Sequence, residues 1–225
     1  MDTKRFCHFD QEAADNLQAW FGQYPGRALL EQETACLNEL LPQIFGYYLV
    51  QLGMAGMYDE AMGECRVGCH LVLASNKNIE NIAVDTRVDM LQLPIATESV
   101  DAVLVPHTLD FTYDPHRVLR EIERILIPEG RILITGFNPW SVWGIYRLLL
   151  KRKKSLPWCA QFISIPRLQD WLRLLDFNGE LIKGTCWSEI LAIFFSWLRC
   201  SSGKAGFNSY SGAARLAEAE AGIGR

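Results

Sequence analysis

The chain has 225 residues, of which 49% are hydrophobic and 21% are charged, and this composition excludes a wholly disordered protein. The 22 Lys and Arg residues against 26 Asp and Glu residues leave a formal net charge of -4. A mildly acidic chain argues against broad, sequence-independent binding to nucleic acid, because such binding needs a basic face.

The cysteine pattern argues against a metal site. The 7 cysteines form no C-x-x-C pair, and their one local cluster, Cys65, Cys69 and His70, has no matching second pair of ligands. We therefore predict no bound metal and reduced thiols. Residues 1–10 lack the apolar core of a signal peptide, and no apolar stretch reaches the roughly 18 residues of a membrane span. These features lead us to expect a cytoplasmic protein.

Two helices are predicted at the start of the chain. Residues 12–21 and 28–41 place apolar side chains at helical spacings, and Tyr24, Pro25 and Gly26 separate the two runs. We interpret residues 1–43 as a helical segment that precedes the main domain.

After residue 43 the chain carries short apolar runs that are continuous rather than alternating. Such runs are typical of strands that are covered on both faces, as in a parallel sheet. The predicted strands are residues 45–52, 70–74, 82–84, 100–105 and 131–135.

The clearest helix lies between the last two of these strands. Asp114 can cap its first turn, Pro115 suits the first helical position, and an apolar stripe runs from Val118 to Leu126. Strand, helix and strand form a βαβ unit, which packs as a right-handed crossover. The predicted fold class is therefore α/β, with a Rossmann-like, mostly parallel sheet, helices on both faces and added N-terminal helices.

Beyond residue 135 the pattern is less regular. Residues 138–150 and 166–175 are predicted helices, residues 180–185 a sixth strand and residues 187–198 a short apolar helix. Residues 201–225 are dominated by Ala, Gly and Ser, so we predict a flexible tail.

A recognisable order of residues follows the third predicted strand. Asp89 closes that strand, Leu93 and Pro94 form a turn, and Val100 and Asp101 lead into the next strand. This order resembles the middle of the class I S-adenosylmethionine-dependent methyltransferases, and the resemblance covers about residues 44–137. The chain looks closest to their ubiquinone/menaquinone-biosynthesis-like small-molecule group, and more narrowly to a bacterial branch of it.

The resemblance implies S-adenosylmethionine as the cofactor, bound at the carboxyl ends of the strands, where open α/β sheets bind ligands. Gln51, Gly53 and Ala55 occupy the motif that cradles the methionine part of the cofactor. Only Gly53 matches outright, because Gln51 is neutral where the family usually has an acid and Met57 replaces a glycine.

The remaining cofactor contacts are implied in the same way. Ser75 and Asn76 stand where the family presents an acid to the ribose hydroxyls. Asp89 matches the residue that meets the adenine amino group, with Met90 beside the ring, and Pro106 lines the cofactor and the acceptor.

His107 is the candidate catalytic residue. It matches the position that lines the acceptor, and a neutral imidazole can accept a proton from an acidic acceptor near pH 7. The alternative is that His107 is a structural hydrogen-bond partner at the end of a strand.

The resemblance further implies that residues 44–200 form the methyltransferase-like domain, that residues 138–200 select the acceptor, and that an antiparallel strand pair completes the sheet. With residues 187–198 predicted as a helix, that pair would be incomplete. Residues 140–154 combine aromatic side chains with a basic run. They either contact a membrane peripherally or form a core-facing helix followed by solvated charges.

We therefore predict an S-adenosylmethionine-dependent methyltransferase that acts on a small, apolar acceptor and has no nucleic-acid partner; the oligomeric state stays open. The alternative is a catalytically inactive protein of the same fold that acts as a binding or scaffold module. The degenerate glycine motif favours that alternative, whereas Asp89 and the Pro106-His107 pair favour the enzyme.

Overall fold

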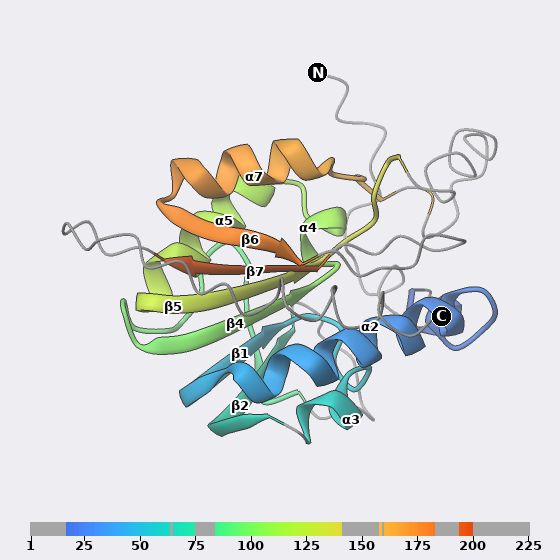
Figure 1. The fold of residues 1–225 in the computed structure, drawn as a ribbon, viewed down its shortest axis with the longest axis horizontal. Helices are drawn as coiled ribbons and strands as arrows, with labels where there is room; N and C mark the ends of the chain where they lie inside the picture. The colour runs from blue at the N-terminus through green and yellow to red at the C-terminus, as the bar shows by residue number, and fades with distance from the viewer. Residues whose placement is uncertain are drawn as a thin grey trace, which may run out of the picture.

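The computed structural model describes residues 17–63, 65–74, 84–140, 158, 160–182 and 194–199 (Figure 1). Ser75, Asn76, residues 141–157 and the predicted tail at residues 201–225 lie outside the described residues.

A mostly parallel sheet forms the centre of the described fold. Its strands follow the order β3-β2-β1-β4-β5-β7-β6; β1 to β5 run parallel, and β7 is antiparallel to both of its neighbours. This architecture confirms the predicted α/β class. The strands are β1 (Phe45–Leu52), β2 (Arg66–Ala74), β3 (Thr86–Arg87), β4 (Val100–Pro106), β5 (Leu126–Thr135), β6 (Phe177–Ile182) and β7 (Phe194–Arg199).

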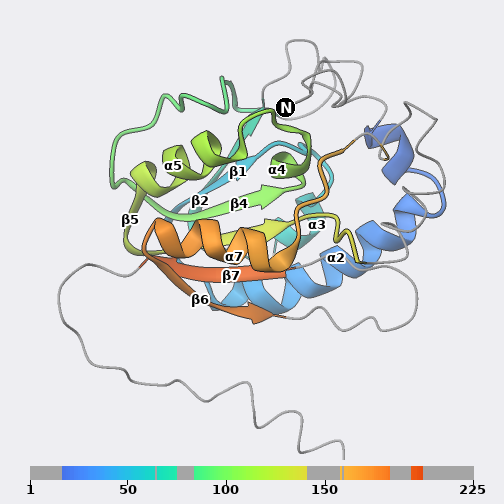
Figure 2. The ribbon, with the colours of Figure 1, turned by 90° about the horizontal axis from the view of Figure 1, so that it is seen from above.

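Helices cover both faces of this sheet. Figure 1 shows α5 and α7 on one face and α2 and α3 on the other, and from above α5 and α7 lie side by side across the strands (Figure 2). The helices are α2 (Gly26–Leu40), followed by the 3-10 turn η2 (Leu41–Gln43), α3 (Asp59–Met62), α4 (Thr108–Phe111), α5 (Pro115–Ile125) and α7 (Ile165–Leu174). None of the described helices is long and apolar enough to span a membrane.

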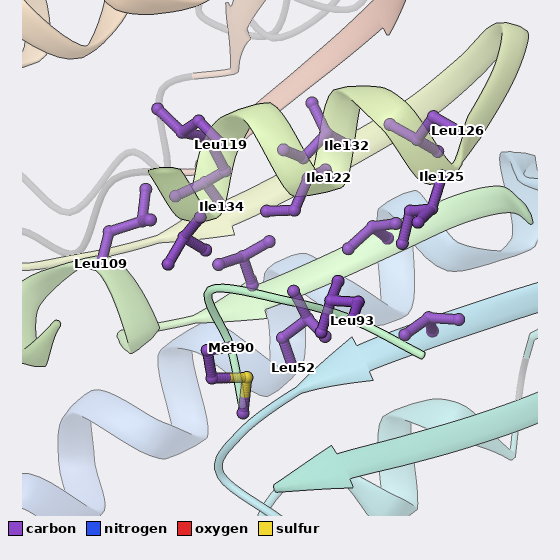
Figure 3. Close-up of a cluster of buried hydrophobic side chains, with 14 of the residues drawn as sticks. Leu52, Met90, Leu93, Leu109, Leu119, Ile122, Ile125, Leu126, Ile132 and Ile134 are labelled. Carbon is purple, nitrogen blue, oxygen red and sulfur yellow. The ribbon is translucent and has the colours of Figure 1, made fainter. Parts of the chain in front are cut away.

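The strands are continuously apolar because each face has its own core. Along β4, Val103 and Val105 pack into the cluster under α5 and α7, whereas Ala102 and Leu104 pack into the cluster under α2. Alternate side chains of a strand point to opposite faces, so a strand covered twice must be apolar at every position. Figure 3 shows the first of these clusters, between α5 and the strands.

The α5 helix forms as its sequence predicts. The Asp114 side chain accepts a hydrogen bond from the Arg117 amide (3.1 Å), and Pro115 opens the first turn. The buried residues at helical spacing are Pro115, Val118, Leu119, Ile122 and Ile125. Each large apolar side chain buried here contributes about 1.5–3 kcal/mol to folding.

The C-terminal strand pair is present, so the prediction of a helix over residues 187–198 is wrong for the part that the structure describes. The strand β7 lies between β5 and β6 and pairs with both. A short apolar run carries no periodicity that separates a buried helix from a buried strand. Strand β5 has open hydrogen-bonding groups along one side, and pairing them with β7 decides the conformation.

The third strand also differs from its predicted position. It occupies Thr86–Arg87, and of the predicted residues 82–84 only residue 84 is described, outside any strand. With two residues, β3 is too short for its own pattern to locate it.

Asp101 ties the beginnings of β1 and β4 together. Its Oδ2 atom accepts hydrogen bonds from the Tyr47 and Tyr48 amides, both at 2.9 Å. A Cβ atom on Gly46 would come within 2.4 Å of this side chain, so the glycine is required by the close approach. These bonds occur next to the register shift between Val100 and Ala102 in the β4–β5 pairing.

We expect Asp101→Ala to lower the free energy of unfolding by about 1–3 kcal/mol, because two backbone amides lose their acceptor. Urea denaturation at neutral pH measures the change. The control is Glu39→Ala, on the exposed side of α2, which we expect to change stability by less than about 0.5 kcal/mol. Equal effects of the two substitutions would contradict the role of Asp101.

Candidate functional site

The carboxyl ends of the central strands meet at one edge of the sheet. The β1–β2 pairing runs to Leu52 and Leu73, and the β4–β5 pairing runs to Pro106 and Thr135. The loops that follow β1, β4 and β5 therefore lie together, as in other open α/β sheets that bind ligands at this edge.

The turn after β1 has an unusual backbone. Gly53, Met54 and Gly56 have φ angles of +85°, +50° and +76°, and only the glycines adopt such values without strain. The Gln51 side chain holds this turn, since its Nε2 atom donates to the carbonyl oxygens of Gly53 (3.0 Å) and Met54 (3.1 Å).

These hydrogen bonds explain why a neutral amide, and not an acid, occupies position 51. A carboxylate here could only face the two carbonyl oxygens, whereas the amide donates to both. The other end of the amide, Oε1, is buried and has no hydrogen-bond partner among the described residues. Leaving a buried acceptor unpaired costs about 1–3 kcal/mol of folding free energy.

The β1 turn lies directly against the start of the loop after β4. The Thr108 hydroxyl donates to the Leu52 carbonyl oxygen, and a Cβ atom on Gly53 would come within 2.8 Å of the same hydroxyl. Gly53 is thus required both by its backbone angle and by this contact.

A buried polar network occupies the end of β4. The His107 Nδ1 atom lies 3.0 Å from Asp110 Oδ2, and its Nε2 atom lies 2.9 Å from Glu33 Oε1 on α2. The Tyr58 hydroxyl donates to Glu33 Oε2 (2.5 Å), and the Phe137 amide donates to Asp110 Oδ2 (2.9 Å). We call Glu33, His107 and Asp110 the histidine network.

The network charges the imidazole. Burial alone lowers the pKa of His107, but the Glu33 and Asp110 carboxylates raise it to about 9, so the ring is protonated at neutral pH. Burial raises the pKa of Asp110, which the hydrogen bond to His107 opposes. Burial and Glu33 raise the pKa of Tyr58 well above its ordinary value.

An apolar cluster, here called the aromatic cap, covers the network. The His107 ring lies 4.4 Å from the Phe137 ring and 5.4 Å from the Phe21 ring, measured between centroids. Met54 and Met57 of the β1 turn pack against this cluster. The cap consists of Leu17, Phe21, Leu29, Phe111, Phe137, Ala160 and Phe162.

The loop after β3 is held by α5. The Arg124 guanidinium donates to the carbonyl oxygens of Leu93 (3.0 Å) and Ile95 (2.8 Å), and Glu121 Oε2 accepts from the Leu93 amide (3.0 Å). Asp89 is exposed and accepts from the Leu91 amide through Oδ1 (2.9 Å). Hydrogen bonds therefore fix this loop, and the Asp89 carboxylate remains exposed at its surface.

The predicted site residues fall into three places. Gln51, Gly53, Ala55, Pro106 and His107 lie in or beside the loops at the carboxyl edge. Asp89 is at the exposed end of the β3 loop, and Met90 is buried in one cluster with Leu52 (Figure 3). Ser75 and Asn76 are outside the described residues.

Sequence reasoning missed Glu33 and Tyr58. A signal for Glu33 was present, because it shares a helix face with the buried Leu29 and Leu37 at four-residue spacing. A carboxylate on an apolar face needs a partner. Tyr58 carries no such signal.

The local cluster of Cys65, Cys69 and His70 is not joined by further ligands in the part of the chain that the structure describes. No group of three His, Cys, Asp or Glu side chains there could hold a metal ion, and Cys65 and Cys69 are free thiols.

The His107 pKa predicts a pH dependence of stability. The folded-state pKa of about 9 lies above the ordinary value of 6.5, so this stabilisation is fully present below pH 6.5 and is lost as the pH rises through 9. We expect the free energy of unfolding to fall by about 3 kcal/mol across this range, and by less in His107→Asn. Urea denaturation measures the fall, and NMR titration of the ring measures the pKa. A ring that titrates at its ordinary pKa would contradict the charged network.

Comparisons with known proteins agree with this architecture. Residues 70–134 match the family described as "Methyltransferase domain". The chain is 36% identical over 152 residues to the uncharacterized protein YafS of Escherichia coli (strain K12), covering 68% of this chain and 60% of that protein. It is 33% identical over 108 residues to a demethylmenaquinone methyltransferase of Thermobifida fusca (strain YX), covering 47% and 44%. The chain thus spans three fifths or less of the length of these relatives.

A solved structure shares the fold. It is an S-adenosylmethionine-dependent methyltransferase of Thermotoga maritima, described as a possible histamine N-methyltransferase, with a TM-score of 0.65 and 21% identity over 82% of this chain and 95% of that one. The cofactor of the family is S-adenosylmethionine, and two features of the turn after β1 fit a bound cofactor: Gly53 has a left-handed backbone without a side chain, and the buried Gln51 Oε1 atom lacks a hydrogen-bond partner among the described residues. The family match over residues 70–134 and the methyltransferase relative agree with the strand order, which is that of the shared fold. The chain therefore belongs to the class I S-adenosylmethionine-dependent methyltransferases, in their ubiquinone/menaquinone-biosynthesis-like group.

Proposed function

We propose that the protein transfers a methyl group from S-adenosylmethionine to a small, apolar acceptor. The observation that carries this proposal is the turn after β1, at the carboxyl edge of the sheet, where Gly53 has a left-handed backbone and the buried Gln51 Oε1 atom has no hydrogen-bond partner among the described residues. A closely approaching ligand with a donor group satisfies both features.

The cofactor contacts follow from this placement. Gln51, Gly53 and Ala55 hold the methionine part, Asp89 accepts from the adenine amino group, and Met90 packs beside the ring. Pro106 lines the methyl group's path, and Ser75 and Asn76 are proposed for the ribose. When bound, the cofactor supplies an activated methyl group on sulfur, so the chain's own task is alignment and exclusion of water.

The aromatic cap supports an apolar acceptor. Phe111 ends α4, the helix that follows β4, and Phe137 lies just after β5. Both belong to the cap, together with Phe162 from the predicted acceptor region at residues 138–200. Aromatic side chains gathered at the carboxyl edge favour the binding of an acceptor that buries apolar surface. A peripheral membrane contact through residues 140–154 stays a prediction, since only Trp140 of that stretch is described, and it is exposed.

Catalysis by His107 as a base also stays a prediction. Both ring nitrogens are hydrogen-bonded to carboxylates, so a base role requires His107 to exchange one carboxylate for the acceptor and to lose its proton. This occupancy favours the alternative, in which the protein is an inactive methyltransferase-fold binding module, more than any other feature of the site.

We expect Gly53→Ala to weaken S-adenosylmethionine binding at least tenfold, because the new Cβ would meet Thr108 at 2.8 Å and strain a backbone with a φ of +85°. Isothermal titration calorimetry with the cofactor measures the dissociation constant. The matched control is Gly63→Ala at the end of α3, where the φ angle is -60° and the new Cβ lies 3.4 Å from its nearest neighbour.

A second variant separates a binding defect from unfolding. Asp89→Asn keeps the acceptor for the Leu91 amide and should weaken binding without lowering the melting temperature. The control, Asp170→Asn on the exposed side of α7, should do neither. An absence of heat from the native protein at millimolar cofactor would overturn the proposed function.

The acceptor class has its own measurement. We expect S-adenosylhomocysteine to form when the protein and the cofactor are mixed with the organic-solvent extract of bacterial cells, and not with the remaining aqueous fraction. Cofactor binding with no product from either fraction would support the inactive binding module.

A further inference from the structure

The histidine network contains more negative than positive charge. Two carboxylates, from Glu33 and Asp110, flank the single imidazolium of His107. Among the described residues, no Lys or Arg side chain forms an ion pair with either carboxylate. The two other described groups that donate hydrogen bonds to these carboxylates, the Tyr58 hydroxyl and the Phe137 amide, are neutral.

This excess charge is buried beside the β1 turn. Thr108 is the residue after His107, and its hydroxyl donates to the Leu52 carbonyl oxygen. The same hydroxyl lies 2.8 Å from the position that a Cβ atom on Gly53 would occupy. Met54 of the turn packs both against the aromatic cap and against the cluster that contains Tyr58. The turn and the network are therefore neighbours, connected through Thr108 and Met54.

The two forms of the cofactor differ in charge at the reacting atom. S-adenosylmethionine carries a positive sulfonium. S-adenosylhomocysteine has lost the methyl group and has a neutral thioether at the same position, and the rest of the two molecules is identical. A negative charge inside the protein is poorly screened by water or salt, so it stabilises the first form and not the second.

We propose that the histidine network is a charge selector, which binds S-adenosylmethionine in preference to S-adenosylhomocysteine and so favours release of the spent cofactor. This inference rests on the proposed function, because it takes the turn after β1 as the cofactor site. It assigns Glu33, on a helix that precedes the sheet, a positioning and electrostatic role toward the cofactor.

The test is the ratio of the two dissociation constants, Kd for S-adenosylhomocysteine over Kd for S-adenosylmethionine, measured by isothermal titration calorimetry. Glu33→Gln keeps an acceptor for His107 and a polar partner for Tyr58 but removes one charge. Because Glu33 also raises the pKa of His107, the ratio is measured at about pH 6, below the ordinary value of 6.5, where the remaining Asp110 carboxylate keeps the ring protonated. We expect the ratio to fall about tenfold, because a buried unit charge is poorly screened and acts on the sulfonium but not on the thioether. Binding of S-adenosylhomocysteine should change by less than twofold.

The control is Glu31→Gln on the same helix, whose exposed carboxylate pairs with Arg27 and should leave the ratio unchanged. Asp110→Asn removes the other carboxylate and replaces Glu33→Gln if that variant does not fold. A ratio that stays unchanged in the folded variants would overturn the charge selector alone. If the native protein binds neither form, the proposed function fails with it.

Discussion

The contact between Glu33 and His107 joins a helix near the start of the chain to the end of a central strand, across 74 positions of sequence. Both side chains are fully buried, and without His107 the Glu33 carboxylate would be an uncompensated charge. Removing one partner of a buried pair costs about 3–5 kcal/mol. The position of α2 on the sheet, the orientation of the His107 ring and the contact of His107 with Asp110 therefore depend on one another.

The rest of the site is a consequence of the parallel sheet. The β1–β4 pairing extends to Gln51 and Leu104, and the β4–β5 pairing extends to Pro106 and Thr135. Because the three strands are parallel and end at the same edge, the loops that follow them converge there. The strands can be covered on both faces because α5 and α7 lie on one side and α2 on the other. The site is thus built on rigid elements, with Asp101 at the opposite end of the same strands holding β1 to β4.

Departures from the family motif have local physical reasons. Gln51 replaces an acid, and its amide supplies two hydrogen bonds to the turn that a carboxylate could not donate. Met57 replaces a glycine, and its side chain packs against both the aromatic cap and the cluster under α2. These substitutions alter how the turn is held while its left-handed backbone at Gly53 remains.

The sequence by itself determined the features that depend on neighbouring residues: strand β1, the capped helix α5, the α/β class and the glycine turn. Periodicity and capping operate over a few positions, so they can be read directly. Tertiary structure alone decided the antiparallel β7, where pairing with β5 outweighed an ambiguous apolar run. It also decided the histidine network, because Glu33, Tyr58, His107 and Asp110 come from separate segments that only packing brings together. The sequence could identify His107 as a chemically capable residue, but its charge state depends on two carboxylates that the fold places beside it.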